Sequence, residues 1–262
     1  MARLRIFALA ALLLAGLAAT GITVFSRMTA DTTTRVDVED VAREARQQAT
    51  NVERGLRPVP GTYTYRVSGT ERVSALGGAK HTFGPQVPAV VELQGTGCEW
   101  SIHFIYAKEH DVTSRYCTTD EGTKLLETNT IVKFFGHEEV VDQPCGQGST
   151  WLVRAGAKPG DSLPAFTCKN ADRSTTHQPT VQRPVDAPQI AGIDPDSLTL
   201  IKDDITVGGG TATGRNPIET WFAPSGLPVR IHEISEVSSP SILGDTDYEL
   251  DIRAELVSAT PK

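Results

Sequence analysis

Alternation of apolar and polar residues dominates the chain from Gly61 to its end. In the first such stretch Tyr63, Tyr65 and Val67 alternate with threonine, arginine and serine, which is typical of a strand with one buried face. A second clear strand presents one apolar face: Cys98, Trp100, Ile102, Phe104 and Tyr106. Glycine and proline turn signals separate further stretches of this kind, and no helical segments alternate with them. The pattern predicts a mainly β fold, an antiparallel curved sheet, sandwich or half-barrel of about 10–12 strands.

The N-terminus has a different pattern. Residues Ile6 to Phe25 carry no charge, and Arg3 and Arg5 precede them. A run of about 20 apolar residues is long enough to span a bilayer as a helix. Because the run extends to Phe25 and is closed by Arg27, an uncleaved signal-anchor is favoured over a cleaved signal peptide. We expect a single-pass protein of the cell membrane whose C-terminal part lies outside the cytoplasm, or, if the leader is cleaved, a secreted one.

Between the anchor and the sheet, residues 28–60 form a connector that contains apolar residues at helical spacing: Val38, Val41, Ala42, Ala45, Ala49 and Val52. This spacing predicts an amphipathic helix over residues 36–54. The helix could be a stalk or a weak self-association element, but a helix that is packed on the domain or solvated is the simpler interpretation. The predicted organisation is an anchor (1–27), the connector (28–60) and an exported β domain (61–262).

The charge of the exported part excludes one class of partner. The chain has 25 basic and 32 acidic residues, a net charge of −7, and Arg3, Arg5 and Arg27 are the only charged residues before Met28. The remainder therefore carries 22 basic and 32 acidic residues, a net charge of −10. So acidic a domain is a poor candidate for binding nucleic acid or anionic surfaces by charge.

The four cysteines, Cys98, Cys117, Cys145 and Cys168, are an even number in an exported chain, so disulfides are expected. Three connectivities exist. Sequential pairing is favoured because Cys98 and Cys117 lie at similar distances on either side of a polar centre, Lys108 and Glu109, as partners in a hairpin do. Cys145 and Cys168 likewise flank a turn at residues 156–160, with Trp151–Val153 and Ala165–Cys168 as the expected arms of one ribbon. A zinc site is the rival, but no CxxC spacing supports it.

No motif identifies a chemistry. The six histidines include no HExxH, no GxSxG elbow is present, and the acidic residues between Asp194 and Asp204 do not fit a calcium loop. His137-Glu138-Glu139 is more typical of a solvated acidic turn than of a metal site. We predict no catalytic, cofactor-binding or metal-ligating residues.

A few residues are candidates for facing a ligand. Glu71 continues the apolar face of the Tyr63 strand, where a buried carboxylate would need a partner or a raised pKa. The simpler expectation is that this end of the strand leaves the sheet. Five aromatic residues could line an apolar pocket, although core filling explains the same alternation more simply: Tyr63, Tyr65, Trp100, Phe104 and Tyr106.

One segment, Glu219-Thr-Trp-Phe-Ala-Pro-Ser-Gly-Leu-Pro-Val-Arg230, resembles a hairpin of LolA-like and LppX-like envelope lipid carriers. The resemblance implies a curved antiparallel sheet over helices, with an apolar cavity for acyl chains. The chain departs from that family in three respects: it has no lipobox cysteine, its evident amphipathic helix precedes the sheet, and it has two expected disulfides. The leader and acidic domain also resemble exported proteins of high-GC bacteria.

These observations favour a non-enzymatic, membrane-anchored protein of the cell envelope that binds a ligand, such as a lipid or another apolar molecule. An alternative is an interaction or scaffolding protein that docks an envelope protein partner and needs no internal cavity. A third hypothesis is a hydrolase of cell-wall material that acts through carboxylates such as Glu71.

Overall fold

The computed structural model describes residues 33–48, 56–75, 78–95, 97–146, 148–241 and 244–262. The predicted membrane segment, Ile6 to Phe25, lies outside these residues. Within the described ranges, no helix combines the length and the apolar composition needed to cross a membrane.

The predicted mainly β, antiparallel fold is confirmed. One sheet of 15 strands contains almost the whole chain after Gly61, and every pairing between its strands is antiparallel. The strands are β1 (Gly61–Val73), β2 (Ala79–Phe83), β3 (Gln86–Leu93), β4 (Glu99–Ala107), β5 (His110–Thr119), β6 (Gly122–Phe134), β7 (His137–Pro144), β8 (Trp151–Arg154), β9 (Phe166–Lys169), β10 (Ser174–His177), β11 (Pro179–Gln182), β12 (Thr199–Gly208), β13 (Thr213–Phe222), β14 (Pro228–Ser241) and β15 (Gly244–Leu256).

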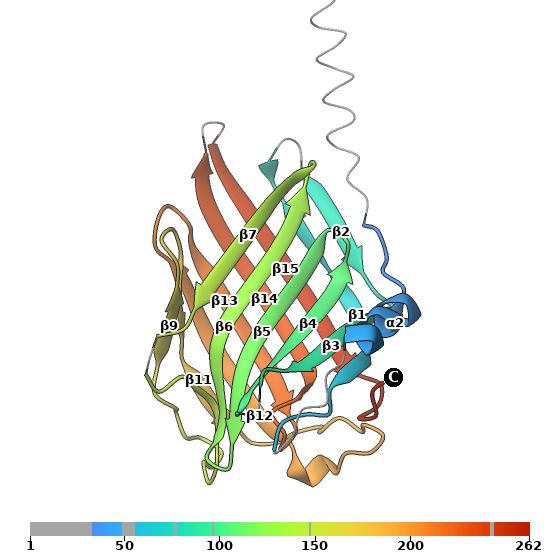
Figure 1. The fold of residues 1–262 in the computed structure, drawn as a ribbon. Helices are drawn as coiled ribbons and strands as arrows, with labels where there is room; N and C mark the ends of the chain where they lie inside the picture. The colour runs from blue at the N-terminus through green and yellow to red at the C-terminus, as the bar shows by residue number, and fades with distance from the viewer. Residues whose placement is uncertain (1–32, 49–55, 76–77, 96, 147, 242–243) are drawn as a thin grey trace, which may run out of the picture.

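The sheet curves into a nearly closed, barrel-like wall (Figure 1). The hydrogen-bonded order is β7-β6-β5-β4-β3-β1-β15-β14-β13-β12-β10-β9, and β2, β8 and β11 pair beside this path with β1, β6 and β12. The two ends of the path, β7 and β9, meet at a seam. A bridge between Cys145 and Cys168 joins the seam at one point, and an ion pair between Arg173 and Glu139 (2.9 Å) crosses it at another.

Both predicted disulfides are present, Cys98–Cys117 and Cys145–Cys168. The first joins neighbouring strands at the end of the β4–β5 hairpin, as expected. The reason given for the second was wrong: its two cysteines are not on one ribbon, because β8 pairs with β6 and β9 pairs with β10. This disulfide instead connects the two ends of the sheet. Disulfides of this kind are typical of proteins that fold in an oxidising environment.

The described part of the predicted connector helix is α2 (Val38–Gln48). The Asp37 carboxylate accepts hydrogen bonds from the amides of Glu39 (2.8 Å) and Asp40 (3.4 Å), which caps the first turn. Ala42 is fully buried, and the helix packs on β1 and β3, as the simpler interpretation expected. Residues 49–55, where the prediction placed the end of the helix, lie outside the described residues.

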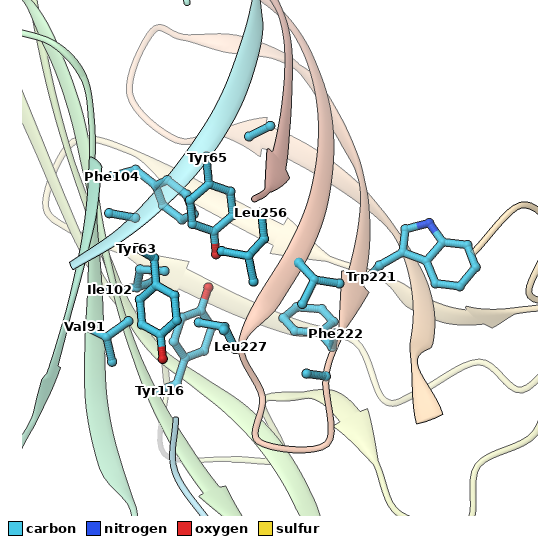
Figure 2. Packing of buried hydrophobic residues seen from close by; sticks show 14 of the residues in the cluster. Tyr63, Tyr65, Val91, Ile102, Phe104, Tyr116, Trp221, Phe222, Leu227 and Leu256 are labelled. Carbon is cyan, nitrogen blue, oxygen red and sulfur yellow. The ribbon is translucent and has the colours of Figure 1, made fainter. Parts of the chain in front are cut away.

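A solid apolar core fills the end of the barrel at which the β13–β14 hairpin turns. Figure 2 shows Tyr63, Tyr116 and Leu227 pointing toward one another there, and Tyr65 packs edge to face on Phe104 with a centroid distance of 4.8 Å. Trp221 belongs to the same buried cluster but points away from Tyr63, Tyr116 and Leu227 (Figure 2). The core therefore closes one end of the barrel and leaves the space beyond it open.

Candidate ligand-binding cavity

Beyond this core the sheet encloses a cavity of about 680 Å³. Aliphatic and aromatic side chains supply most of its lining, including Val112, Ile205, Ile218, Ile231, Leu250 and Ile252. Strand periodicity explains the lining, because alternate residues of each strand face inward. The volume and the mainly apolar surface with a few polar groups are typical of small-molecule sites, which span about 300–1,000 Å³.

Two of the six residues predicted to face a ligand line the cavity. All five aromatic residues belong to the buried core, but only Phe104 and Tyr106 also line the cavity, whereas Tyr63, Tyr65 and Trp100 do not. Core filling is therefore the correct interpretation for these three aromatic residues. Glu71, the sixth, lies behind the lining and contacts two residues that belong to it.

Glu71 is the centre of a buried polar cluster. Its side chain is fully buried, and its Oε1 accepts a hydrogen bond from His81 Nδ1 at 2.7 Å. Its Oε2 accepts from His110 Nδ1 and from the Tyr248 hydroxyl, both at 2.8 Å. The expectation that this end of β1 leaves the sheet is wrong, since Glu71 pairs with Leu250 of β15 on one side and His81 of β2 on the other.

These hydrogen bonds determine the protonation state of Glu71. Burial is the largest single effect and by itself would raise the pKa of this carboxyl group. The hydrogen bonds from His110 and His81 outweigh it, with help from Tyr248, and lower the pKa to about 2. Glu71 is therefore an anion at neutral pH with both oxygens bonded, so it lacks the proton that a general acid must donate.

Glu233 is a second carboxylate on the inner face of the barrel. It lies between Ile231 and Ser235 on β14 and lines the cavity, where Asn216 Nδ2 of β13 donates to its Oε1 at 3.0 Å. Burial raises the pKa of Glu233, partly opposed by the Asn216 hydrogen bond. Glu233 is only half-buried by area, because its exposed surface faces the cavity inside the sheet. In the described part of the chain, Glu233 forms no ion pair.

A carboxylate–histidine pair lies on another part of the lining. His177 Nδ1 of β10 is 2.7 Å from Asp203 Oδ2 of β12, and Phe166 stacks on the imidazole at a centroid distance of 4.5 Å. The backbone amide of Gln178 donates to the other Asp203 oxygen at 2.9 Å. In a neutral imidazole held in this way, Nε2 is the acceptor. His110 and His177 thus both line the cavity with Nδ1 bonded to a carboxylate.

Polar residues also face the cavity at the seam. Arg173 and Glu139, the ion pair that crosses the seam, both belong to the lining. Gln143 of β7 also lines the cavity, is only 5 % exposed, and has a side-chain nitrogen without a hydrogen-bond partner. Within the described ranges, no cluster of three or more His, Cys, Asp or Glu side chains has the geometry to hold a metal ion.

Sequence reasoning did not single out five residues of the lining and of the polar cluster behind it: His81, His110, Asn216, Glu233 and Tyr248. Asp203 was considered only as a possible calcium ligand. The available signal was the alternation itself, since Glu233 and Tyr248 occur at inward positions of strands. What was missing was any indication that the inward face of the sheet borders an empty space.

The structure thus defines a class of protein: a nearly closed antiparallel β sheet around a mainly apolar cavity with a few polar groups. No family model matches the chain, and searches of curated proteins and of solved structures likewise found no match.

Proposed function

We propose that this protein binds an apolar or amphiphilic small molecule in the barrel cavity and holds it outside the cytoplasm, as an envelope carrier does. The observation that supports this most directly is the cavity of about 680 Å³, lined mainly by apolar side chains. Binding of an apolar ligand to such a surface is favourable, because it removes apolar area from contact with water. The few convergent polar groups would then orient the ligand.

The anchor and the lipid-carrier resemblance are part of the proposal. The two disulfides support an extracytoplasmic location, and the apolar run from Ile6 to Phe25 would hold the domain at the membrane, from which an apolar ligand could be collected. The segment that resembles the lipid carriers, Glu219 to Arg230, forms the end of β13, the turn and the start of β14.

The cavity favours this proposal over the two alternatives. A scaffolding protein that only docks a partner has no use for an internal apolar space. A cell-wall hydrolase acting through Glu71 would need this carboxyl group to reach the bond that is cleaved, whereas Glu71 is buried behind the lining with both oxygens hydrogen-bonded to protein groups.

Extraction of the full-length protein tests the proposal. The protein would be purified from a host that exports it, extracted with organic solvent and analysed by mass spectrometry. A filled-cavity variant, Ile218→Trp, places a larger side chain in the lining, and Glu219→Trp makes a comparable change at the next, exposed position of β13. We expect a stoichiometric ligand in the wild type and in Glu219→Trp, and much less in Ile218→Trp. Equal amounts in all three proteins, or none in the wild type, would contradict the proposal.

A further inference from the structure

The inner surface of the barrel is acidic. Three carboxylates line the cavity, those of Glu139, Asp203 and Glu233, against one guanidinium group, that of Arg173. No lysine belongs to the lining. The Glu71 carboxylate adds a further negative charge directly behind His110 and Tyr248.

Among the residues that the structure describes, only one of these carboxylates lacks a compensating set of donors. Glu71 accepts three hydrogen bonds, Asp203 accepts from His177 and from a backbone amide, and Glu139 forms an ion pair with Arg173. Glu233 accepts a single hydrogen bond, from Asn216. An ionised carboxylate enclosed in this way is unfavourable unless a cation or several donors accompany it.

Asn216 is the donor to Glu233 within the described residues. Because a carboxylate can only accept, Asn216 must present its Nδ2 to Glu233, and its Oδ1 is then left buried without a hydrogen-bond partner. Glu233 and Asn216 both line the cavity, but the Asn216 Oδ1 atom itself is buried. Gln143, more than nine-tenths buried on β7, likewise has a buried side-chain nitrogen without a hydrogen-bond partner. The half-exposed Glu233 carboxyl group is therefore the acceptor that a ligand in the cavity can reach.

The groups around Glu233 do not supply a permanent cation. Tyr106 of β4, His110 of β5, Glu71 of β1 and Tyr248 of β15 are the titratable groups that interact with it electrostatically. Two of these are phenols and one is an anion; the imidazole of His110 already faces Glu71. A cation supplied by the ligand would be the strongest partner available to Glu233.

We propose that the cavity selects amphiphiles with a basic amine head group, whose ammonium ion binds to Glu233 while the apolar chain fills the remaining space. This specificity rests on the proposed ligand-binding function. Amphiphiles with a carboxylate or phosphate head are disfavoured, because Glu71, Asp203 and Glu233 repel them. Neutral alcohols gain hydrogen bonds but no ion pair.

Equilibrium binding of three radiolabelled probes with the same chain, dodecylamine, dodecanol and dodecanoate, tests the proposal. The full-length protein would be measured in lipid nanodiscs at neutral pH, with the Ile218→Trp protein as the blank for partitioning into lipid. We expect dodecylamine to bind about tenfold more tightly than dodecanol, and dodecanoate to bind most weakly. Glu233→Gln keeps the shape and the Asn216 contact, so it should abolish the advantage of the amine. Glu236→Gln removes the same charge from an exposed position of β14 and should leave that advantage unchanged.

The outcomes separate the two proposals. Equal binding of amine and alcohol, or tightest binding of dodecanoate, would overturn the head-group specificity and leave the ligand-binding function standing. An amine advantage that survives in Glu233→Gln would overturn the assignment to Glu233. If none of the three probes binds, both proposals fail. The ranking of the probes on the wild type is decisive even if Glu233→Gln does not fold.

Discussion

Replacing Glu71 by glutamine tests the cluster that organises the polar side of the cavity. The substitution keeps the size of the side chain but removes the negative charge that His81, His110 and Tyr248 approach within 2.8 Å. A glutamine amide has one acceptor oxygen in place of two, and its NH₂ group would face an imidazole nitrogen that now donates. At least one buried group therefore loses its partner or must change tautomer.

The magnitude follows from the pKa of Glu71. Its value of about 2 in the folded protein, against an ordinary 4.5, corresponds to about 3 kcal/mol in favour of the folded state at neutral pH. Because the pKa is lowered on folding, this contribution is fully present above pH 4.5 and is lost as the pH falls toward 2. We therefore expect Glu71→Gln to reduce the free energy of unfolding by about 3 kcal/mol at neutral pH, and by much less near pH 2.

Urea unfolding followed by tryptophan fluorescence, at several pH values, measures this difference. The control is Glu249→Gln, which removes a carboxylate that pairs with Arg72 on the surface, with side chains 48 % and 61 % exposed. Exposed ion pairs contribute less than about 1 kcal/mol, so the control should remain close to the wild type. If Glu71→Gln is as stable as Glu249→Gln and loses stability in acid as the wild type does, the reasoning about the cluster is refuted.

Two further predictions concern the framework of the barrel. Gly226 has a φ of +83°, and a Cβ there would lie 2.6 and 2.7 Å from two threonine hydroxyl oxygens, so Gly226→Ala should lower the free energy of unfolding by about 2–3 kcal/mol. The control, Gly95→Ala, has a φ of +63° but no atom within 4 Å of the added Cβ, and should lower it by about 1 kcal/mol. Equal losses of stability in urea unfolding would contradict this. Replacing the Cys145–Cys168 disulfide by a serine pair should cost about 3 kcal/mol and speed ligand release, since it joins the ends of the sheet. The same change at the other disulfide, which joins hydrogen-bonded neighbours, should leave the release rate unchanged, as stopped-flow fluorescence can show.

Long alternating stretches made the fold class predictable from the sequence. The Tyr63 and Trp100 strands, β1 and β4, are long enough to show a period of two without ambiguity. The short strands β10 and β11 have four residues each, which gives too few alternations to recognise, and the prediction of about 10–12 strands was accordingly low. The equally short β8 and β9 were predicted, but as partners of each other. Closure was also unpredictable, because it depends on contacts between the two ends of the sheet.

The cavity was hidden from sequence reasoning for a different reason. Alternation indicates which side chains face inward, but it does not give the distance between opposite walls. Tyr63 and Tyr106 both occupy inward positions, yet the first is part of a solid core and the second borders an empty space. Apolar patterns of this kind are identical for a filled and a hollow barrel, and only the curvature of the sheet distinguishes the two.

One partner of Glu71 could have been predicted from the sequence. Gly77-Gly78 marks a turn after the first strand, and Glu71 and His81 lie five residues on either side of position 76. A hairpin around this point pairs Glu71 with His81, as observed, and directly paired residues share one face of an antiparallel sheet. The alternation therefore implied not only a buried carboxylate but also one of its partners. His110 and Tyr248, 39 and 177 residues away, depend on the path of the whole sheet and could not be foreseen. An acidic residue at an inward position is thus better interpreted as a reason to search for a donor across the nearest turn than as a sign that the strand has ended, because three hydrogen bonds can keep a carboxylate buried.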